Sequence, residues 1–356
     1  MTVQEVLLDA GGVPLSGLLA EPAGGPPRAL VLALHGGGMR AGYFDSRVVP
    51  GLSLLELGSR LGYAVLALDR PGYGASAAAL PDGLPVSGQA RTVRAALAGF
   101  AREHAVGAGV FVLAHSNGGK LALALAADAS GGGPGSGSFG FGSFGSGSGS
   151  GSGPSSGPGF GFGSDPGPGP GSGSGSGPSS GPGFGFGSDP GPGSGPALLG
   201  LDVSGIGSRF AVGPELMPGP DTAGDWRRHW GALRCYPPDA LRRGQELLAR
   251  VPDTEALEGP RWPELYPAIA ARVRVPVRFT FAEQERWWRH DEEAVAALTA
   301  PLASAVVRVD RQPDAGHNIS LGWAARTYHL RALGFLEECL LARDAAAPSR
   351  ARAAAA

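Results

Sequence analysis

The sequence predicts an α/β protein whose mostly parallel, eight-stranded sheet is covered by helices on both faces. Two observations predict it. Short, continuous apolar runs alternate with segments of helical periodicity, and the loops after these runs are rich in glycine, histidine and acidic residues. Continuous apolar runs are typical of parallel strands that are buried on both faces. In such open sheets the functional residues gather at the carboxyl ends of the strands.

The first half of the chain supplies five of the predicted strands. Residues 3–8 and 13–20 flank a Gly11-Gly12 turn, and we expect them to form a hairpin. Fully apolar runs predict the next three strands at 29–34, 64–68 and 109–113. Helical spacing of apolar residues predicts helices at 48–61, 87–103 and 119–129, the first of them ending at Gly62.

The same alternation returns in the second half. Strands are predicted at 198–203, 275–281 and 305–310, and helices at 238–250, 290–300 and 320–342. These elements assign residues 1–130, 197–204 and 271–345 to one folded core. Residues 205–270, which we call the cap segment, are irregular and rich in Pro and Trp. The Ala/Arg-rich tail at 346–356 is expected to be disordered.

A low-complexity segment at 131–196 interrupts the core. Its 66 residues hold 29 of the 62 glycines of the chain, and the motif GSGPSSGPGFGFGSDPGPG occurs twice with a 24-residue period. Each repeat offers only two Phe to bury, so a solenoid is excluded and a disordered insertion is predicted. Self-association through Phe is the alternative. Loop-closure entropy grows only logarithmically with length, so such an insertion is tolerated between a helix and a strand.

Charge, cysteine content and hydropathy exclude several classes of protein. The net charge of −2 does not fit a strongly basic nucleic-acid-binding surface. The two cysteines cannot form a disulfide framework, and no Cys/His spacing indicates a metal site. The N-terminus lacks the features of a signal peptide, and no apolar run reaches the roughly 18 residues of a membrane span. We therefore expect a cytoplasmic protein with no cofactor, metal, nucleic acid or membrane partner.

Ser116 is the candidate nucleophile. It lies in Ala114-His115-Ser116-Asn117-Gly118, directly between a predicted strand and a predicted helix. A serine in so sharp a turn projects its hydroxyl outward at the N-terminus of the helix, and the crowded positions two before and two after it need small residues. Capping of the helix is the alternative role for this serine.

His317 is the candidate base, because a serine hydroxyl needs a base to become a good nucleophile. It lies in the loop between the last predicted strand and the last predicted helix. This position brings it to the same edge of the sheet as Ser116. His35 and His115 also follow strands, but His35 begins a glycine-rich turn and His115 is expected to point away from Ser116.

The third member of such a site must orient the imidazole and stabilise its charged form. Glu285 is preferred, because it stands far enough past the strand 275–281 for a loop to turn its carboxylate towards His317. Glu283 is the rival acid, and Asp310 and Asp314 are the remaining alternatives.

The turn His35-Gly36-Gly37-Gly38 is predicted to form an oxyanion hole. Glycines let backbone N–H groups approach a developing negative charge. Gly37, with or without Gly38, would supply one donor, and the N–H of Asn117 the other. A phosphate-binding loop is the competing interpretation, but the turn lacks the Gly-Lys-Ser/Thr ending and the G-x-G-x-x-G spacing.

Together these motifs resemble the α/β-hydrolase superfamily, in its serine esterase and thioesterase branch, over about residues 3–342 without the insertion. The carrying motifs are His35–Gly38, Asp69-Arg70-Pro71-Gly72-Tyr73-Gly74, 114–118, Ala282–Glu285 and Gly316-His317-Asn318. The order of nucleophile, acid and histidine is that of the superfamily. Ala114 replaces the usual Gly and a Glu replaces the commoner Asp acid. The resemblance implies an α/β-hydrolase fold in which residues 205–270 form a lid.

The resemblance also implies the chemistry. The leading expectation is hydrolysis of an ester or thioester of a bulky, largely apolar acyl group, free or carrier-bound, through an acyl-enzyme. Acyl transfer, elimination or cyclisation at the same site is one alternative, and a non-catalytic ligand-binding fold is another. Oligomeric state is left open. The expected pocket residues are His115, Tyr43, Trp226, Trp230, Trp287 and Trp288, although at least half of the aromatic residues in the cap segment would simply pack it onto the core.

Overall fold

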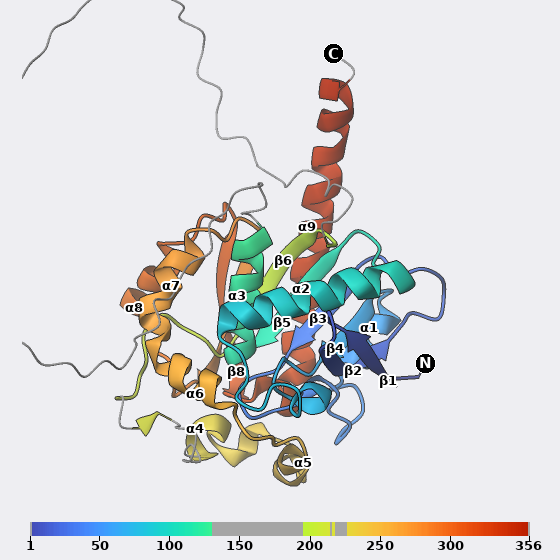
Figure 1. Ribbon diagram of the computed structural model, residues 1–356. Helices are drawn as coiled ribbons and strands as arrows, with labels where there is room; N and C mark the ends of the chain where they lie inside the picture. The colour runs from blue at the N-terminus through green and yellow to red at the C-terminus, as the bar shows by residue number, and fades with distance from the viewer. Residues whose placement is uncertain (1, 130–194, 214–215, 218–225, 355–356) are drawn as a thin grey trace, which may run out of the picture. The chain divides into compact units, whose positions relative to one another are not determined.

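The computed structural model describes residues 2–129, 195–213, 216–217 and 226–354 (Figure 1). The low-complexity segment, for which disorder is predicted, lies outside the described residues except for its last two positions. The backbone of Trp226 is described, but its side chain is not.

Among the described residues, eight strands form one sheet in the order β1-β2-β4-β3-β5-β6-β7-β8. β2 pairs antiparallel with both β1 and β4, and the remaining pairs are parallel. This confirms the mostly parallel sheet of the sequence prediction. The strands are β1 Gln4–Asp9, β2 Pro14–Ala20, β3 Leu30–Leu34, β4 Ala64–Leu68, β5 Val110–His115, β6 Leu198–Ser204, β7 Val277–Gln284 and β8 Val307–Gly316.

Helices cover both faces of the sheet, and the central strand β3 shows how. Leu30, Leu32 and Leu34 join a buried cluster with residues of α2 (Val86–Glu103) and α3 (Asn117–Ala129). Val31 and Ala33 join a second cluster with residues of α1 (Leu54–Arg60) and α9 (Ala325–Ala354). Successive side chains of a strand point to opposite faces. Accordingly, α2 and α3 lie in front of the strands in Figure 1 and α9 lies behind them.

The ends of two strands and one helix lie beyond their predicted positions. β7 and β8 pair as far as Gln284 and Gly316, with an irregularity between Ala282 and Gln284. This extension brings the acidic residues after β7 next to the residues after β8. The helix α9 continues to Ala354, through most of the tail that we expected to be disordered. Ala and Arg have high helix propensity, which accounts for the difference.

Short helices make up the described part of the cap segment: α4 Trp226–Trp230, α5 Ala240–Glu246, α6 Asp253–Glu258 and α7 Trp262–Ala270. The stretch after α5 and the first turn of α6 lie against the loops that follow β3 and β4. The N–H of Ala249 donates to the carbonyl of Gly38 (3.0 Å), and the N–H of Thr254 donates to that of Asp82 (2.9 Å). After β7, the core continues with α8 Glu292–Thr299.

Within the described ranges, no helix is long and apolar enough to cross a bilayer.

Candidate active site

Ser116 occupies a strained turn between β5 and α3. Its φ angle is 52°, in the left-handed region that costs a non-glycine residue about 1 kcal/mol or more. The neighbouring strand holds the turn in place, because the N–H of Ser116 donates to the carbonyl of Ser204 on β6 (2.8 Å). A Cβ atom at Gly118 would lie 2.2 Å from the carbonyl oxygen of Leu34. This close approach explains the small residue that the sequence pattern requires there.

His317 and Glu285 form a buried pair. His317 Nδ1 lies 2.7 Å from Glu285 Oε2, and both side chains are almost fully buried. Glu285 Oε1 accepts hydrogen bonds from the N–H groups of Arg286 (3.0 Å) and Trp287 (2.9 Å). Burial by itself would raise the pKa of Glu285, but His317 and these donors hold it below its usual value. The carboxylate is therefore ionised and fixes the orientation of the imidazole ring.

The other acidic residues considered from the sequence have different partners. Glu283 is exposed and accepts a hydrogen bond from the N–H of Asp314 (2.7 Å). Asp314 has a positive φ angle. Asp310 accepts one from Arg278 Nε (2.6 Å). The geometry therefore favours Glu285 over Glu283 as the partner of His317.

Ser116 and His317 lie at the same carboxyl edge of the sheet, Ser116 after β5 and His317 after β8. The ring of His115, next to Ser116 in the chain, lies 4.7 Å from the ring of His317. In the described part of the chain, no hydrogen bond joins Ser116 Oγ to His317. Such bonds are often long in the absence of substrate.

In the glycine-rich turn after β3, one of the two candidate amides already donates a hydrogen bond. The N–H of Gly38 donates to the hydroxyl of Tyr73 (3.2 Å). Among the described residues, neither the N–H of Gly37 nor that of Asn117 donates to another protein group. The sequence did not decide between Gly37 and Gly38 as the first oxyanion donor. The structure favours Gly37, with the N–H of Asn117 as the second donor.

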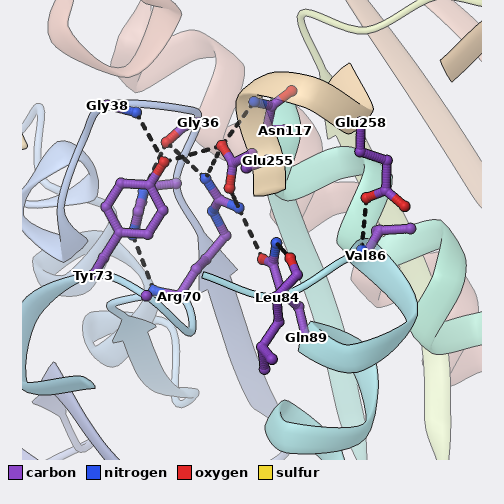
Figure 2. Close-up of polar contacts among 12 residues, drawn as sticks. Gly36, Gly38, Arg70, Tyr73, Leu84, Val86, Gln89, Asn117, Glu255 and Glu258 are labelled. Atoms are coloured by element: carbon purple, nitrogen blue, oxygen red, sulfur yellow. Dashed lines mark hydrogen bonds and ion pairs between the residues drawn. The ribbon is translucent and has the colours of Figure 1, made fainter. Parts of the chain in front are cut away.

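A buried polar network lies beside this turn (Figure 2). At its centre, Glu255 of α6 pairs with Arg70, which follows β4, through two hydrogen bonds of 2.7 and 2.9 Å. Burial would raise the pKa of Glu255, but Arg70 and the neighbouring donors lower it to about 2. In the sequence, Arg70 stands out only as part of the motif after the strand 64–68. Glu255 was not predicted, because no motif or periodicity marks it within the irregular cap segment.

The predicted pocket residues fall into two groups. Tyr43 stacks on His115 at 4.8 Å, and the ring of His229 lies 4.9 Å from Trp287 and 5.9 Å from His317. His115 and His229 thus lie next to the candidate base, and Tyr43 and Trp287 pack against these two histidines. Trp230 instead packs on Tyr236, and Trp288 stacks on Phe210. The side chain of Trp226 lies outside the described residues.

A small cavity lies next to Asn117 and contains residues that sequence reasoning did not place in the site. Lys120, the only lysine against 28 arginines, faces it and donates to the carbonyl of Gly259 (3.2 Å). Burial lowers the pKa of Lys120 to about 8. The further lining residues are Arg70, Val86, Gln89, Glu255, Glu258, Trp262 and Leu265. Within the described residues, no cluster of His, Cys, Asp and Glu could hold a metal ion.

The sequence of the chain matches a known protein family. The profile of the alpha/beta hydrolase family matches residues 30–327, which is more than half of the chain. No curated protein sequence matches the chain.

Solved structures with the same fold include two enzymes of low sequence identity. One is a thermophilic esterase from Thermogutta terrifontis, with a TM-score of 0.52 and 14% identity over 94% of this chain and 99% of the esterase. The other is a monoacylglycerol lipase from Paleococcus ferrophilus, with a TM-score of 0.51 and 14% identity over 95% of this chain and all of the lipase. At these identities the likeness establishes the fold.

Proposed function

Because the chain belongs to the alpha/beta hydrolase family, we propose that it is a serine hydrolase that cleaves an ester or thioester through an acyl-enzyme. The observation that carries the proposal is the buried His317–Glu285 pair at the same sheet edge as the strained Ser116 turn. These are the three groups that acyl transfer to a serine requires. Family membership alone would not choose between a hydrolase and a binding protein.

The proposed mechanism follows from the contacts. Ser116 Oγ attacks the substrate carbonyl while His317 takes its proton through Nε2, since Nδ1 faces Glu285. The N–H groups of Gly37 and Asn117 stabilise the oxyanion, each by about 3–4 kcal/mol in comparable sites. His317 then protonates the leaving group, and water activated by the same histidine releases the acyl group from Ser116.

We propose that the enzyme works in the cytoplasm on a small-molecule substrate with a bulky, largely apolar acyl group. This substrate is either free or attached to a carrier. The aromatic side chains of Tyr43 and Trp287 beside the candidate base support an apolar group. The two solved structures with this fold are an esterase and a monoacylglycerol lipase, and both activities agree with cleavage of an ester.

The test is activity on a panel of p-nitrophenyl esters and acyl thioesters of increasing chain length, with Ser116→Ala as the comparison. We expect activity that rises with acyl length in the wild type, and a loss of at least about 10⁴-fold in the variant. Fluorophosphonate labelling followed by mass spectrometry should place the adduct on Ser116. Unchanged activity in Ser116→Ala, or no labelling of the wild type, would contradict the proposal. Product analysis with an added alcohol or amine separates hydrolysis from acyl transfer.

A further inference from the structure

Glu255 connects the cap segment to both sides of the proposed oxyanion hole. Its Oε1 atom accepts hydrogen bonds from Asn117 Nδ2 (2.8 Å), the Tyr73 hydroxyl (3.0 Å) and Arg70 Nη2 (2.9 Å). Asn117 belongs to α3, and the other two follow β4. One carboxylate oxygen from α6 therefore holds groups from two separate elements of the core (Figure 2).

The same contacts continue into the turn that contains Gly37. The Tyr73 hydroxyl accepts the N–H of Gly38 (3.2 Å), and Arg70 Nη2 donates to the carbonyl of Gly36 (3.2 Å). The residues on either side of Gly37 are thus tied to partners of Glu255. The carbonyl of Gly36 and the N–H of Gly37 belong to one peptide group, so Arg70 fixes the group that carries the proposed oxyanion donor, and Tyr73 fixes the next one.

Gly37 also lies directly against the network. A Cβ atom at this position would come within 2.7 Å of Asn117 Nδ2 and 3.1 Å of Glu255 Oε1. No side chain larger than glycine fits there unless the Asn117–Glu255 hydrogen bond moves. The Cα atom of Gly37 therefore packs directly against the hydrogen bond between Asn117 and Glu255.

The charge of Glu255 would by itself oppose an oxyanion nearby. Arg70 pairs with both carboxylate oxygens, and both side chains are buried, so the pair is neutral as a whole. Such a pair contributes fixed geometry to the site, because donors that are already oriented do not have to reorganise during the reaction.

We propose that Glu255 is a positioning residue that holds the Gly37 and Asn117 amides in place for the oxyanion. On this proposal the oxyanion hole is complete only while α6 of the cap segment is seated on the loops after β3 and β4. The inference rests on the proposed hydrolase function and adds a requirement to it: a residue outside the core strands sets the rate of the chemical step.

The experiment compares Glu255→Gln, Glu255→Ala and a matched control, Asp253→Asn. Asp253 lies on the same helix, but its half-buried side chain forms, among the described residues, an ion pair only with nearby Arg250 (2.5 Å). For a p-nitrophenyl ester we expect kcat to fall about 10- to 100-fold in Glu255→Ala with little change in KM, since the affected interaction forms only in the transition state. Glu255→Gln retains an oxygen acceptor and should recover most of kcat. Asp253→Asn should match the wild type.

A second measurement separates positioning from simple anchoring of the cap segment. An alkyl boronic acid that forms a tetrahedral adduct with Ser116 should bind more weakly to Glu255→Ala by the same factor as the loss of kcat. Loss of packing alone would change KM. It would leave both kcat and the affinity for the boronic acid at their wild-type values. Wild-type kcat and wild-type boronic acid affinity in Glu255→Ala would overturn the proposal.

Two further variants keep the test decisive if Glu255→Ala does not fold. Arg70→Met combined with Glu255→Leu removes both charges together, and Tyr73→Phe removes only the oxygen between Glu255 and Gly38. We expect kcat to fall about 10-fold or more in the double variant and about 3-fold in Tyr73→Phe. Folded variants with wild-type kcat would overturn the positioning role. A wild type that neither turns over esters nor labels at Ser116 would instead overturn the hydrolase proposal.

Discussion

Two buried carboxylates lie at the same edge of the sheet, and they differ in the kind of cation that each one faces. Glu285 follows a core strand and faces His317, whereas Glu255 belongs to the cap segment and faces Arg70. Both accept hydrogen bonds from several donors and both have a lowered pKa. Histidine can give up its proton near neutral pH and arginine cannot. The first pair is therefore suited to proton transfer, and the second to holding a loop in place.

The largest expected effect tests the first pair. Glu285→Gln should lower kcat about 10³- to 10⁴-fold, because the neutral amide no longer stabilises the charged imidazole or fixes its tautomer. Glu283→Gln is the matched control two residues away. It should change kcat less than about threefold, because Glu283 contacts only the Asp314 turn. Steady-state kinetics on one ester decide the comparison, and an equal loss in both variants would remove the distinction between the two acids.

The second pair should have a stability signature that depends on which partner is removed. Glu255→Leu alone leaves Arg70 as an uncompensated buried charge and should lower the free energy of unfolding by about 3–5 kcal/mol. Arg70→Met combined with Glu255→Leu should recover most of this loss, because no charge is left buried alone. Urea denaturation followed by circular dichroism measures both. If the double variant is no more stable than the single one, the pair stabilises the fold through more than charge balance.

Buried neutral histidines outside both pairs should set the acid limit of the fold. Burial, with the nearby Arg70 charge at His35, lowers the pKa of His35 to about 3, and burial does the same for His329. The unfolded chain then binds more protons than the folded one between about pH 6.5 and pH 3. Stability is therefore full above this window and falls as the pH is lowered through it, by about 1.4 kcal/mol per pH unit for each histidine.

His329→Gln should remove about a third of that slope, because burial also lowers the pKa of His115 and the Gln side chain binds no proton in the unfolded state. Urea midpoints measured from pH 7 to pH 4 for the wild type and the variant check this expectation. The lowered pKa of Glu255 acts in a different window, between about pH 4.5 and pH 2, where its contribution to stability is lost. Parallel curves for the wild type and His329→Gln would contradict the assignment of the acid limit to buried histidines.

The smallest effect is expected from the low-complexity segment, which contains neither pair and none of the predicted catalytic loops. Replacing residues 132–195 with a short linker should leave kcat and the unfolding midpoint close to those of the full chain. Enzyme assays and thermal denaturation of the two proteins test this. A folded deletion variant without activity would show that the segment has a role of its own.

Local patterns in the sequence were sufficient wherever a residue works from the end of a strand. The small residues around Ser116 predicted its turn, because the pattern marks a sharp strand-to-helix turn, although the atoms that crowd Gly118 come from Leu34 and His35 at the end of β3. The position of Glu285 past its strand predicted its contact with His317, because β7 and β8 are neighbours in a parallel sheet. Lys120 carried a signal of another kind. It is the only lysine of the chain, but nothing in its neighbouring residues indicates that its side chain is buried beside the site.

The sequence by itself determined the parallel sheet, the order of its strands along the chain and the loops that carry Ser116, Glu285 and His317. These follow from periodicity and from turn chemistry, which act over a few residues. Only the tertiary structure showed that Glu255 joins Arg70, Tyr73 and Asn117, that Tyr73 binds the N–H of Gly38, and that Trp230 packs on Tyr236 and Trp288 on Phe210. Those contacts join positions up to 185 residues apart. They depend on how an irregular segment packs onto the core, which no local pattern specifies.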